Sequence, residues 1–185
     1  MVVLASASPR RRELMKRITP SFEVATADIN EEKSYNLPPL QAVLDIAKRK
    51  CLKVKDNYPD DIVITADTIV VLNDEIIHKP IDEIDAKNIL NKLSDKTHQV
   101  ITTYCINYKD RFIENYVVSN VTFNKLSEQL INEYVATGSP LDKAGAYGVQ
   151  DGEKFPVVKK VNGSIDNVIG FPVDEIRKDL LEIQK

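Results

Sequence analysis

The spacing of apolar residues changes repeatedly along the chain, and this change predicts an α/β fold. Apolar residues that alternate with polar ones, or form short runs, suit strands, whereas apolar residues three and four positions apart suit amphipathic helices. Both patterns alternate from one end of the chain to the other, which favours one mixed α/β unit. Strands are predicted near residues 2–4, 22–25, 61–72, 99–108 and 112–123.

The helix expected after Pro38 and Pro39 carries one polar residue on its apolar face. The face consists of Leu40, Val43, Leu44, Ala47, Cys51 and Val54. Lys50 falls on the same face, seven residues after Val43 and four before Val54. Two interpretations stay open: the lysine stem packs while its ammonium reaches water, or the ammonium enters a binding site.

Polar residues interrupt the apolar run of DIVITADTIVVL at Ala66–Thr68, so we expect the strand to break there. Strand ends in α/β proteins deliver side chains to ligand crevices. Asp67 therefore caps a turn, accepts a proton from water or binds a divalent metal ion. The acidic loop at 28–36, with Glu31 and Glu32, is either solvated or able to complete a metal site.

Sequence signals also place the ends of the later elements. Asp82 and Ser127 are predicted helix caps, and a hairpin is predicted about Asn162 and Gly163, joining 155–161 to 165–169. The final helix is expected to bury Val173, Ile176, Leu180 and Leu181.

Three consecutive arginines stand at the start of a predicted helix. Ser8 reads as the N-cap and Pro9 as the first helical residue, so Arg10, Arg11 and Arg12 would lie at the positive end of the helix dipole. That position costs energy unless an anion binds there or the side chains extend into water. The pattern favours a phosphate site over a solvated face.

Composition narrows the class of protein. The chain has 185 residues, a formal net charge of −3 and 43% hydrophobic residues, which suits a single domain over 1–185 and argues against a broad nucleic-acid surface. No apolar run approaches the roughly 20 residues of a membrane span, and no signal peptide is evident. Cys51 and Cys105 are expected to be buried, reduced thiols of a cytoplasmic protein.

Several catalytic signatures are missing. There is neither a Walker loop nor a GxSxG nucleophile motif, so phosphates would have to be held by side chains and a helix end. His78 and His98 lack metal-type spacing, and both are interpreted as structural or surface residues.

Many short blocks in order give the chain a family resemblance. The blocks are LASASPRRRELM, DINEE, AKRKC, TADTIV, HKP, KLSDKTHQVIT, LDKAGAYGVQ and NGSIDNVIGFP. Together they resemble the Maf family along essentially the whole chain. The resemblance implies a nucleoside triphosphate pyrophosphatase that uses Mg²⁺ or Mn²⁺ and can be a homodimer. The implied fold is similar to the inosine triphosphate pyrophosphatases, with an elongated mixed sheet, helices and two lobes around a central cleft.

The resemblance also implies roles for single residues. Asp67 matches the proton acceptor and Glu31 the acidic residue that assists it, both as metal ligands, while Lys50 and Lys79 match two cleft lysines. Arg11, Thr68 and Gln150 match positions linked to substrate choice. The implied substrate-binding residues are Ser6, Ser8, Arg10, Arg11, Thr68 and Gln150.

The block DKAGAYGVQ resembles the branch of the family that acts on dTTP and UTP more than the branch that acts on 7-methyl-GTP. A glutamine amide such as Gln150 can pair with the imide edge that uracil and thymine share. Three departures stand out: His78 and Asp95 where glycine is usual, and DGEKF in place of a longer glycine-rich sequence after Gln150. A second interpretation is a regulatory binding protein, because the family is named for inhibition of septum formation.

Overall fold

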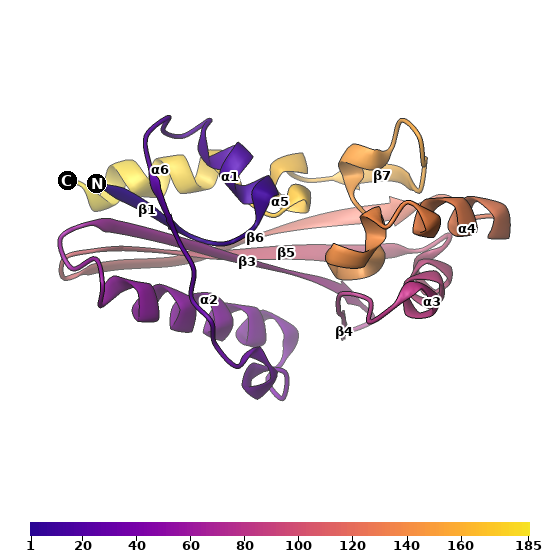
Figure 1. Ribbon diagram of the computed structural model, residues 1–185, viewed down its shortest axis with the longest axis horizontal. Coiled ribbons are helices and arrows are strands. Elements are labelled where there is room, and N and C mark those ends of the chain that lie inside the picture. Colours follow the sequence, from indigo (N-terminus) through magenta and orange to yellow (C-terminus); the bar gives the residue numbers. More distant parts are fainter. The chain divides into compact units, whose positions relative to one another are not determined.

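A computed structural model describes residues 1–185 and contains one mixed, seven-stranded sheet together with helices (Figure 1). The strand order is β2-β1-β3-β5-β6-β7, and β4 pairs with β3. The strands are β1 (Val2–Ala5), β2 (Glu23–Ala25), β3 (Ile62–Leu72), β4 (Glu75–Ile77), β5 (Thr97–Tyr108), β6 (Arg111–Phe123) and β7 (Val158–Asn162). β1 pairs in parallel with β2 and β3, whereas β4 and β7 pair antiparallel with β3 and β6. The predicted mixed α/β sheet is confirmed.

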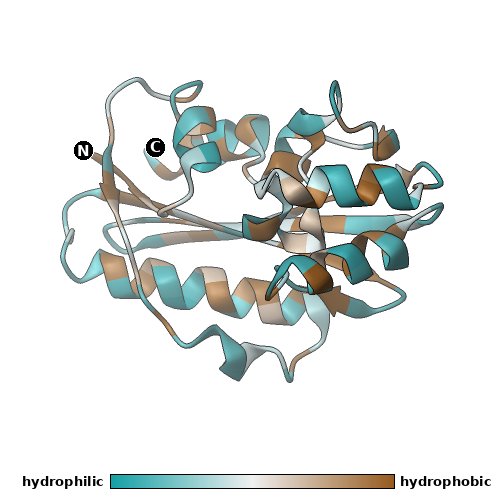
Figure 2. Ribbon diagram, turned by 45° about the vertical axis from the view of Figure 1, so that its right-hand side comes forward, coloured by the Kyte–Doolittle hydropathy of each residue, from teal (hydrophilic) through white to brown (hydrophobic).

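The α-helices alternate with the strands, as the changing period predicts. They are α1 (Pro9–Met15), α2 (Pro39–Lys55), α3 (Glu83–Leu93), α4 (Glu128–Ala136), α5 (Ile165–Ile169) and α6 (Val173–Ile183). Short 3₁₀ turns are η1 (Glu31–Ser34), η2 (Ser139–Asp142), η3 (Ala144–Ala146) and η4 (Val149–Asp151). Hydrophilic and hydrophobic residues both colour the longer helices in Figure 2, as expected for helices with one buried face. None of the helices combines the length and apolar character that a bilayer span requires.

The chain forms two compact units, neither of which is one continuous segment. Unit 1 consists of residues 1–68, 102–117 and 170–185, and unit 2 of residues 69–101 and 118–169. Three of the four points where the chain passes between units lie inside β3, β5 and β6.

Each unit has its own hydrophobic core. In unit 1, α2 packs on the sheet through Val3, Ala5, Ala47, Cys51, Val54, Val63 and Cys105. Both cysteines are free and buried, as predicted. In unit 2, α3 and α4 share a core with β3, β5 and β6, formed by residues that include Val70, Leu90, Leu93, Val121, Phe123, Ile131 and Tyr134.

The predicted helix caps are confirmed. Asp82 accepts a hydrogen bond from the backbone N–H of Asp85 at 2.8 Å, and Ser127 caps α4 in the same way. Asn73 and Asp74 join β3 to β4 with φ values of 51° and 63°, the backbone that a tight two-residue turn needs.

Four local predictions are wrong. β3 runs without a break through Ala66–Thr68: β1 pairs with it at Ile62–Ile64, β4 pairs with it at Val70–Leu72, and β5 is its neighbour on the other side. The hairpin about Asn162 and Gly163 does not form: β7 pairs with β6, and Ile165–Ile169 is the helix α5. The Ser164 hydroxyl accepts from the Asn167 N–H and so starts a helix where a strand was expected.

The other two corrections concern η1 and α6. The acidic loop contains the 3₁₀ turn η1. In α6, Val173, Ile176 and Leu180 are buried as predicted, whereas Leu181 is 61% exposed because it lies on the opposite helix face.

Candidate functional site

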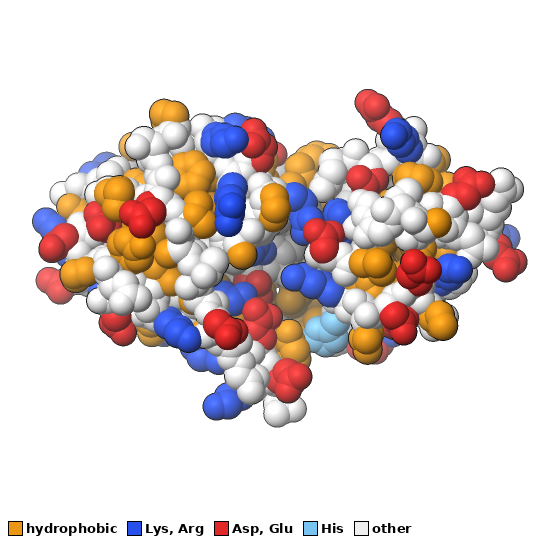
Figure 3. Space-filling view, in the orientation of Figure 1, with side chains coloured by type: hydrophobic (Ala, Val, Ile, Leu, Met, Phe, Trp, Pro, Cys, Tyr) orange, Lys and Arg blue, Asp and Glu red, His pale blue; other side chains and the backbone are white.

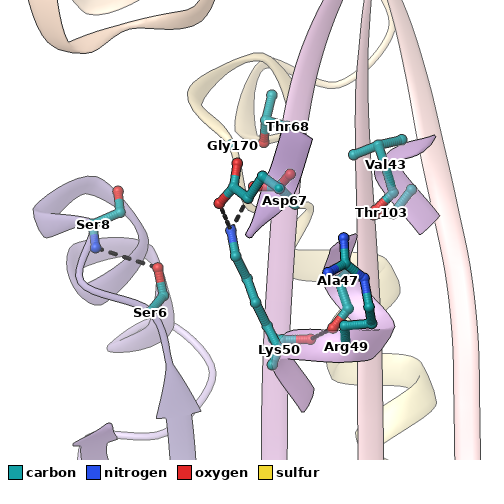
Figure 4. A network of polar contacts seen from close by, with 12 residues as sticks. Ser6, Ser8, Val43, Ala47, Arg49, Lys50, Asp67, Thr68, Thr103 and Gly170 are labelled. Carbon is teal, nitrogen blue, oxygen red and sulfur yellow. Dashed lines mark hydrogen bonds and ion pairs between the residues drawn. The ribbon is translucent and has the colours of Figure 1, made fainter. Parts of the chain in front are cut away.

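Ser6 and Ser8 shape the loop between β1 and α1. The Ser8 side chain caps α1 by accepting from the Arg11 N–H at 3.4 Å, and the Ser8 N–H donates to Ser6 Oγ at 3.3 Å (Figure 4). Pro9 is the first helical residue, as predicted. These contacts bring the Arg11 side chain back over the loop that precedes it.

The Arg11 guanidinium is held by three internal acceptors. Its Nε donates to the Gly170 carbonyl at 2.9 Å, and its two terminal nitrogens donate to Thr68 Oγ1 at 3.1 Å and Ser6 Oγ at 3.4 Å. Burial lowers the pKa of Arg11, and the Asp67 carboxylate opposes that shift. A guanidinium remains protonated throughout the ordinary pH range. Arg11 is therefore a fixed positive charge that joins α1 to β3 and to the start of α6.

The three arginines do not share one environment. Arg11 is tied to the interior of unit 1, Arg10 is half-buried and Arg12 is exposed. The interpretation of a solvated face thus holds for Arg12 alone. Substrate binding by Arg10 and Arg11 stays a prediction.

A charged cluster lies where β3 passes α2, and we name Glu31, Lys50 and Asp67 the carboxylate–lysine cluster. The Lys50 ammonium lies 2.6 Å from Glu31 Oε1 and 3.3 Å from Asp67 Oδ1. The side chains of Lys50 and Asp67 are only 15% and 14% exposed. Figure 4 shows the lysine extending from α2 toward the Asp67 carboxylate. The interpretation that the Lys50 ammonium only snorkels to solvent is therefore wrong, because the ammonium lies between two carboxylates.

Because β3 is unbroken, the side chains of Asp67 and Thr68 lie on opposite faces of the sheet. Successive side chains of a strand point to opposite faces of the sheet. Asp67 accordingly meets Lys50 of α2, whereas Thr68 meets Arg11 of α1 and shares a 2.9 Å hydrogen bond with Thr102 of β5. Two adjacent residues thus serve two different polar networks.

The burial of Asp67 disfavours the ionised form of its carboxyl group. Burial raises the pKa of Asp67, and the positive charges of Lys50 and Arg11 counteract part of that shift. Burial also raises the pKa of Tyr35 to about 12, with Glu31 and Asp67 contributing, so the Tyr35 hydroxyl stays protonated beside Glu31 at 3.4 Å. A raised carboxylate pKa makes Asp67 a stronger base than an exposed aspartate.

A second set of contacts holds η1, and therefore Glu31, against α2. Arg49 donates to Asp45 Oδ2 at 2.8 Å and to the Asn30 carbonyl at 2.9 Å, and it also contacts Ser34 Oγ. Ser34 Oγ in turn donates to Asp45 at 2.7 Å. Sequence reasoning missed this set, although Asp45 and Arg49 stand four residues apart, the spacing of a helical ion pair.

Thr102 and Gly170 were also missed. Thr102 is fully buried and Gly170 contributes only a carbonyl oxygen. The one signal in the sequence is a pair of threonines, Thr102 and Thr103, with apolar residues on both sides in the predicted strand 99–108.

The carboxylate–lysine cluster suits a divalent cation only together with a ligand that brings more oxygens. Glu31 and Asp67 converge on one ammonium, so their oxygens already face a shared positive charge. No group of three or more His, Cys, Asp or Glu side chains is arranged to hold a metal. Mg²⁺ commonly takes one or two carboxylates and completes its shell with phosphate oxygens and water. This donor set fits such an ion.

Lys79 and Gln150 belong to unit 2. Lys79 is exposed and follows β4, and Gln150 is exposed within η4. Their participation with the carboxylate–lysine cluster in one site stays a prediction. His98 is buried against Tyr147, which confirms its structural interpretation, and His78 is exposed.

Charge is mixed over the face of the molecule drawn in Figure 3, where basic and acidic side chains lie among one another. This agrees with the formal net charge of −3. Basic residues of this chain therefore act locally on that face, rather than as a broad stripe that would follow a nucleic-acid backbone.

Comparisons with known proteins agree on a family. The family described as Maf-like protein matches residues 1–183. A dTTP/UTP pyrophosphatase of Pyrococcus furiosus is 41% identical over 182 residues, covering 98% of this chain and 94% of the relative. A dTTP/UTP pyrophosphatase of Photorhabdus laumondii is 44% identical over 173 residues, with 93% and 88% covered.

Among solved structures, a HAM1 protein from Coxiella burnetii is similar in fold. The TM-score is 0.55 with 12% identity, and 98% of each chain is covered. At that identity the likeness concerns the fold alone.

Proposed function

This chain belongs to the Maf family, and from that premise we propose that it hydrolyses dTTP and UTP between the α and β phosphates. The products are a nucleoside monophosphate and pyrophosphate, which suits a role in cleaning nucleotide pools. The observation that carries the proposal is the carboxylate–lysine cluster, in which a largely buried base and a largely buried cation lie 3.3 Å apart.

In the proposed reaction, Asp67 takes the proton of the attacking water. The water oxygen bonds to the α-phosphorus while the bond from that phosphorus to the bridging oxygen breaks, and its electron pair leaves with pyrophosphate. Negative charge grows on the leaving group, and fixed cations stabilise it. Lys50, Arg10 and Lys79 are the proposed cations, with Ser6 and Ser8 contributing hydroxyls to the substrate.

A divalent metal ion, Mg²⁺ or Mn²⁺, would be held by Asp67 and Glu31 in this proposal. When bound, such an ion neutralises phosphate charge and lowers the pKa of a coordinated water. The contacts that hold η1 against α2 would keep Glu31 close to Lys50 and Asp67 for this role.

The proposed preference for dTTP and UTP depends on Gln150, with Arg11 and Thr68 supporting it. The Gln150 amide can accept from N3–H and donate to O4 of uracil or thymine, whereas cytosine presents the reverse pattern. A mismatched base leaves polar groups unpaired, which is a strong source of discrimination.

Purified protein with Mg²⁺ or Mn²⁺ tests the proposal on a panel of dTTP, UTP, CTP, GTP and 7-methyl-GTP. We expect pyrophosphate and a monophosphate as products, with the highest kcat/KM for dTTP or UTP. Asp67→Asn keeps the side-chain shape but loses the base, so turnover should fall by about 10³-fold or more.

The control is Asp61→Asn, an aspartate whose carboxylate contacts the amino terminus at 2.7 Å, outside the carboxylate–lysine cluster. It should keep wild-type turnover. Near-normal turnover in Asp67→Asn would refute the mechanism, and fastest turnover of 7-methyl-GTP would refute the substrate. Failure to release pyrophosphate from any nucleotide would favour the regulatory binding protein and a role in septum formation.

We also propose that the protein acts in the cytoplasm, supported by two buried free thiols. A homodimer is a further proposal, and light scattering of the purified chain would test it.

A further inference from the structure

The segment DGEKF, which departs from the expected glycine-rich sequence, begins with Asp151, whose carboxylate is hydrogen-bonded within unit 2. Asp151 Oδ2 accepts from the Tyr134 hydroxyl at 2.6 Å and from Ser139 Oγ at 2.8 Å. Asp151 directly follows Gln150 and closes the 3₁₀ turn η4. One end of the turn that carries Gln150 is therefore fixed to α4.

The same tyrosine fixes the other end of that turn. The backbone N–H of Gly148 donates to the Tyr134 hydroxyl at 2.9 Å. Burial raises the pKa of Tyr134, so the hydroxyl keeps its proton and can donate to Asp151 while it accepts from Gly148. The ring is fixed as well, because it is fully buried and stacks on Phe155 with centroids 4.7 Å apart.

Gly148 also determines where the Gln150 side chain lies. A Cβ at Gly148 would come within 3.0 Å of both Cδ and Oε1 of Gln150, and within 2.9 Å of Lys143 Cε. The φ of Gly148 is −125°, which any residue adopts. Glycine is thus needed at this position because a side chain would collide with the Gln150 amide, and not because the backbone conformation demands it.

We propose that Tyr134 is a positioning residue for nucleobase selection, holding Gln150 through Asp151 on one side and Gly148 on the other. The inference rests on the proposed role of Gln150 in reading the uracil or thymine edge. A base-reading amide discriminates only when its donor and acceptor are held in place, because a mobile amide can turn to match cytosine. Tyr134 supplies that constraint without touching substrate.

The test compares kcat/KM for UTP and CTP in Tyr134→Phe and in a matched control. The control is Tyr104→Phe, which removes another fully buried tyrosine hydroxyl that donates to a carboxylate, Asp179, at 2.7 Å in unit 1. We expect the ratio of UTP to CTP to fall about tenfold or more in Tyr134→Phe, mainly through CTP gaining, and to stay at the wild-type value in Tyr104→Phe.

Gly148→Ala gives a second measurement that does not remove the tyrosine. Its added methyl group would displace two flexible side chains, those of Gln150 and Lys143. The ratio should therefore fall while the melting temperature stays near the wild-type value. An unchanged ratio in folded Tyr134→Phe and Gly148→Ala would overturn the inference. So would an equal fall in Tyr104→Phe, since that result would reflect general destabilisation.

Gln150→Ala separates this inference from the proposed function. If its ratio falls while the ratios of Tyr134→Phe and Gly148→Ala do not, Gln150 reads the base but Tyr134 does not position it. If Gln150→Ala keeps the wild-type ratio, the proposed base reading is wrong and the positioning role fails with it.

Discussion

His98 is a buried histidine whose two ring nitrogens differ in their surroundings. Its Nε2 lies 2.7 Å from the Tyr147 hydroxyl, whereas Nδ1 is buried without a hydrogen-bond partner. The rings of Phe123 and Tyr147 meet it edge-on, at centroid distances of 5.0 and 5.3 Å. Burial lowers the pKa of His98 to about 4, because a charged imidazole would lose its hydration there.

This residue should make the free energy of unfolding depend on pH. The His98 pKa in the folded protein lies below its value in the unfolded chain, which is near 6.5, so protonation of His98 favours the unfolded chain. The contribution of neutral His98 to the free energy of unfolding is therefore fully present above pH 6.5 and is lost as the pH falls toward 4. The loss is on the order of 3 kcal/mol. Urea unfolding between pH 7 and pH 4 should show a shallower dependence in His98→Gln than in wild type. The exposed His78→Gln should keep the wild-type dependence, and equal slopes in all three proteins would contradict the prediction.

At the scale of elements, the junction between β7 and α5 depends on Gly163. Its φ is +127°, and a Cβ there would lie 2.7 Å from Ser119 Oγ and 3.0 Å from Ser119 Cα. Gly138, which ends α4, has a φ of +76°, but a Cβ added to it would meet no atom within 4 Å. A side chain at Gly138 or Gly163 is therefore expected to strain the backbone. Only at Gly163 would it also clash with neighbouring atoms.

Replacing Gly138 or Gly163 with alanine should distinguish the cost of backbone strain alone from the cost of strain together with a steric clash. Gly138→Ala should lower the free energy of unfolding by about 1–2 kcal/mol, the cost of a left-handed backbone with a side chain. Gly163→Ala should cost clearly more, because the backbone of β6 at Ser119 would also have to move. The midpoints of urea unfolding measure both losses, and a loss in Gly163→Ala no larger than that in Gly138→Ala would contradict the assigned packing.

At the scale of the whole molecule, the two units share strands. Because the chain passes between them inside β3, β5 and β6, neither unit is a segment that can be excised and folded alone. If one unit unfolded alone, β3, β5 and β6 would each stay ordered over only part of their length. We therefore expect a single cooperative transition.

The two cysteines give a probe for that cooperativity. Both are buried in unit 1, so their reaction with a thiol reagent in urea reports the opening of that unit. Leu90→Ala removes a fully buried side chain from the core of unit 2 and should cost about 2–5 kcal/mol. The urea midpoint for thiol exposure should fall with it. A midpoint that stays at the wild-type value would mean that unit 1 unfolds independently.

The sequence by itself determined most of the kinds of element and many of their ends. Residue spacing correctly placed Val43, Ala47, Cys51 and Val54 on the buried face of α2, although Ala42 and Ile46 complete that face in place of Leu40 and Leu44. Short polar side chains identified the caps at Ser8, Asp82 and Ser127. These features depend on neighbours within a few residues, whose chemistry the sequence contains in full. The order of many short blocks likewise identified the family, which the comparisons confirm.

Only the tertiary structure decided features that depend on partners distant in the chain. Asp67 was expected at a strand break, yet β3 runs straight through it, paired with β1 before Asp67 and with β4 after it. The Asn162–Gly163 signal predicted a hairpin, but the pairing of β7 with β6 and the cap at Ser164 outweighed it. Arg11 was expected to face an anion, and the tertiary structure adds three acceptors from separate segments that hold its guanidinium, while its role toward an anion stays a prediction. Sequence spacing cannot reveal such contacts, because the energy of a polar side chain is set by the groups that folding brings around it.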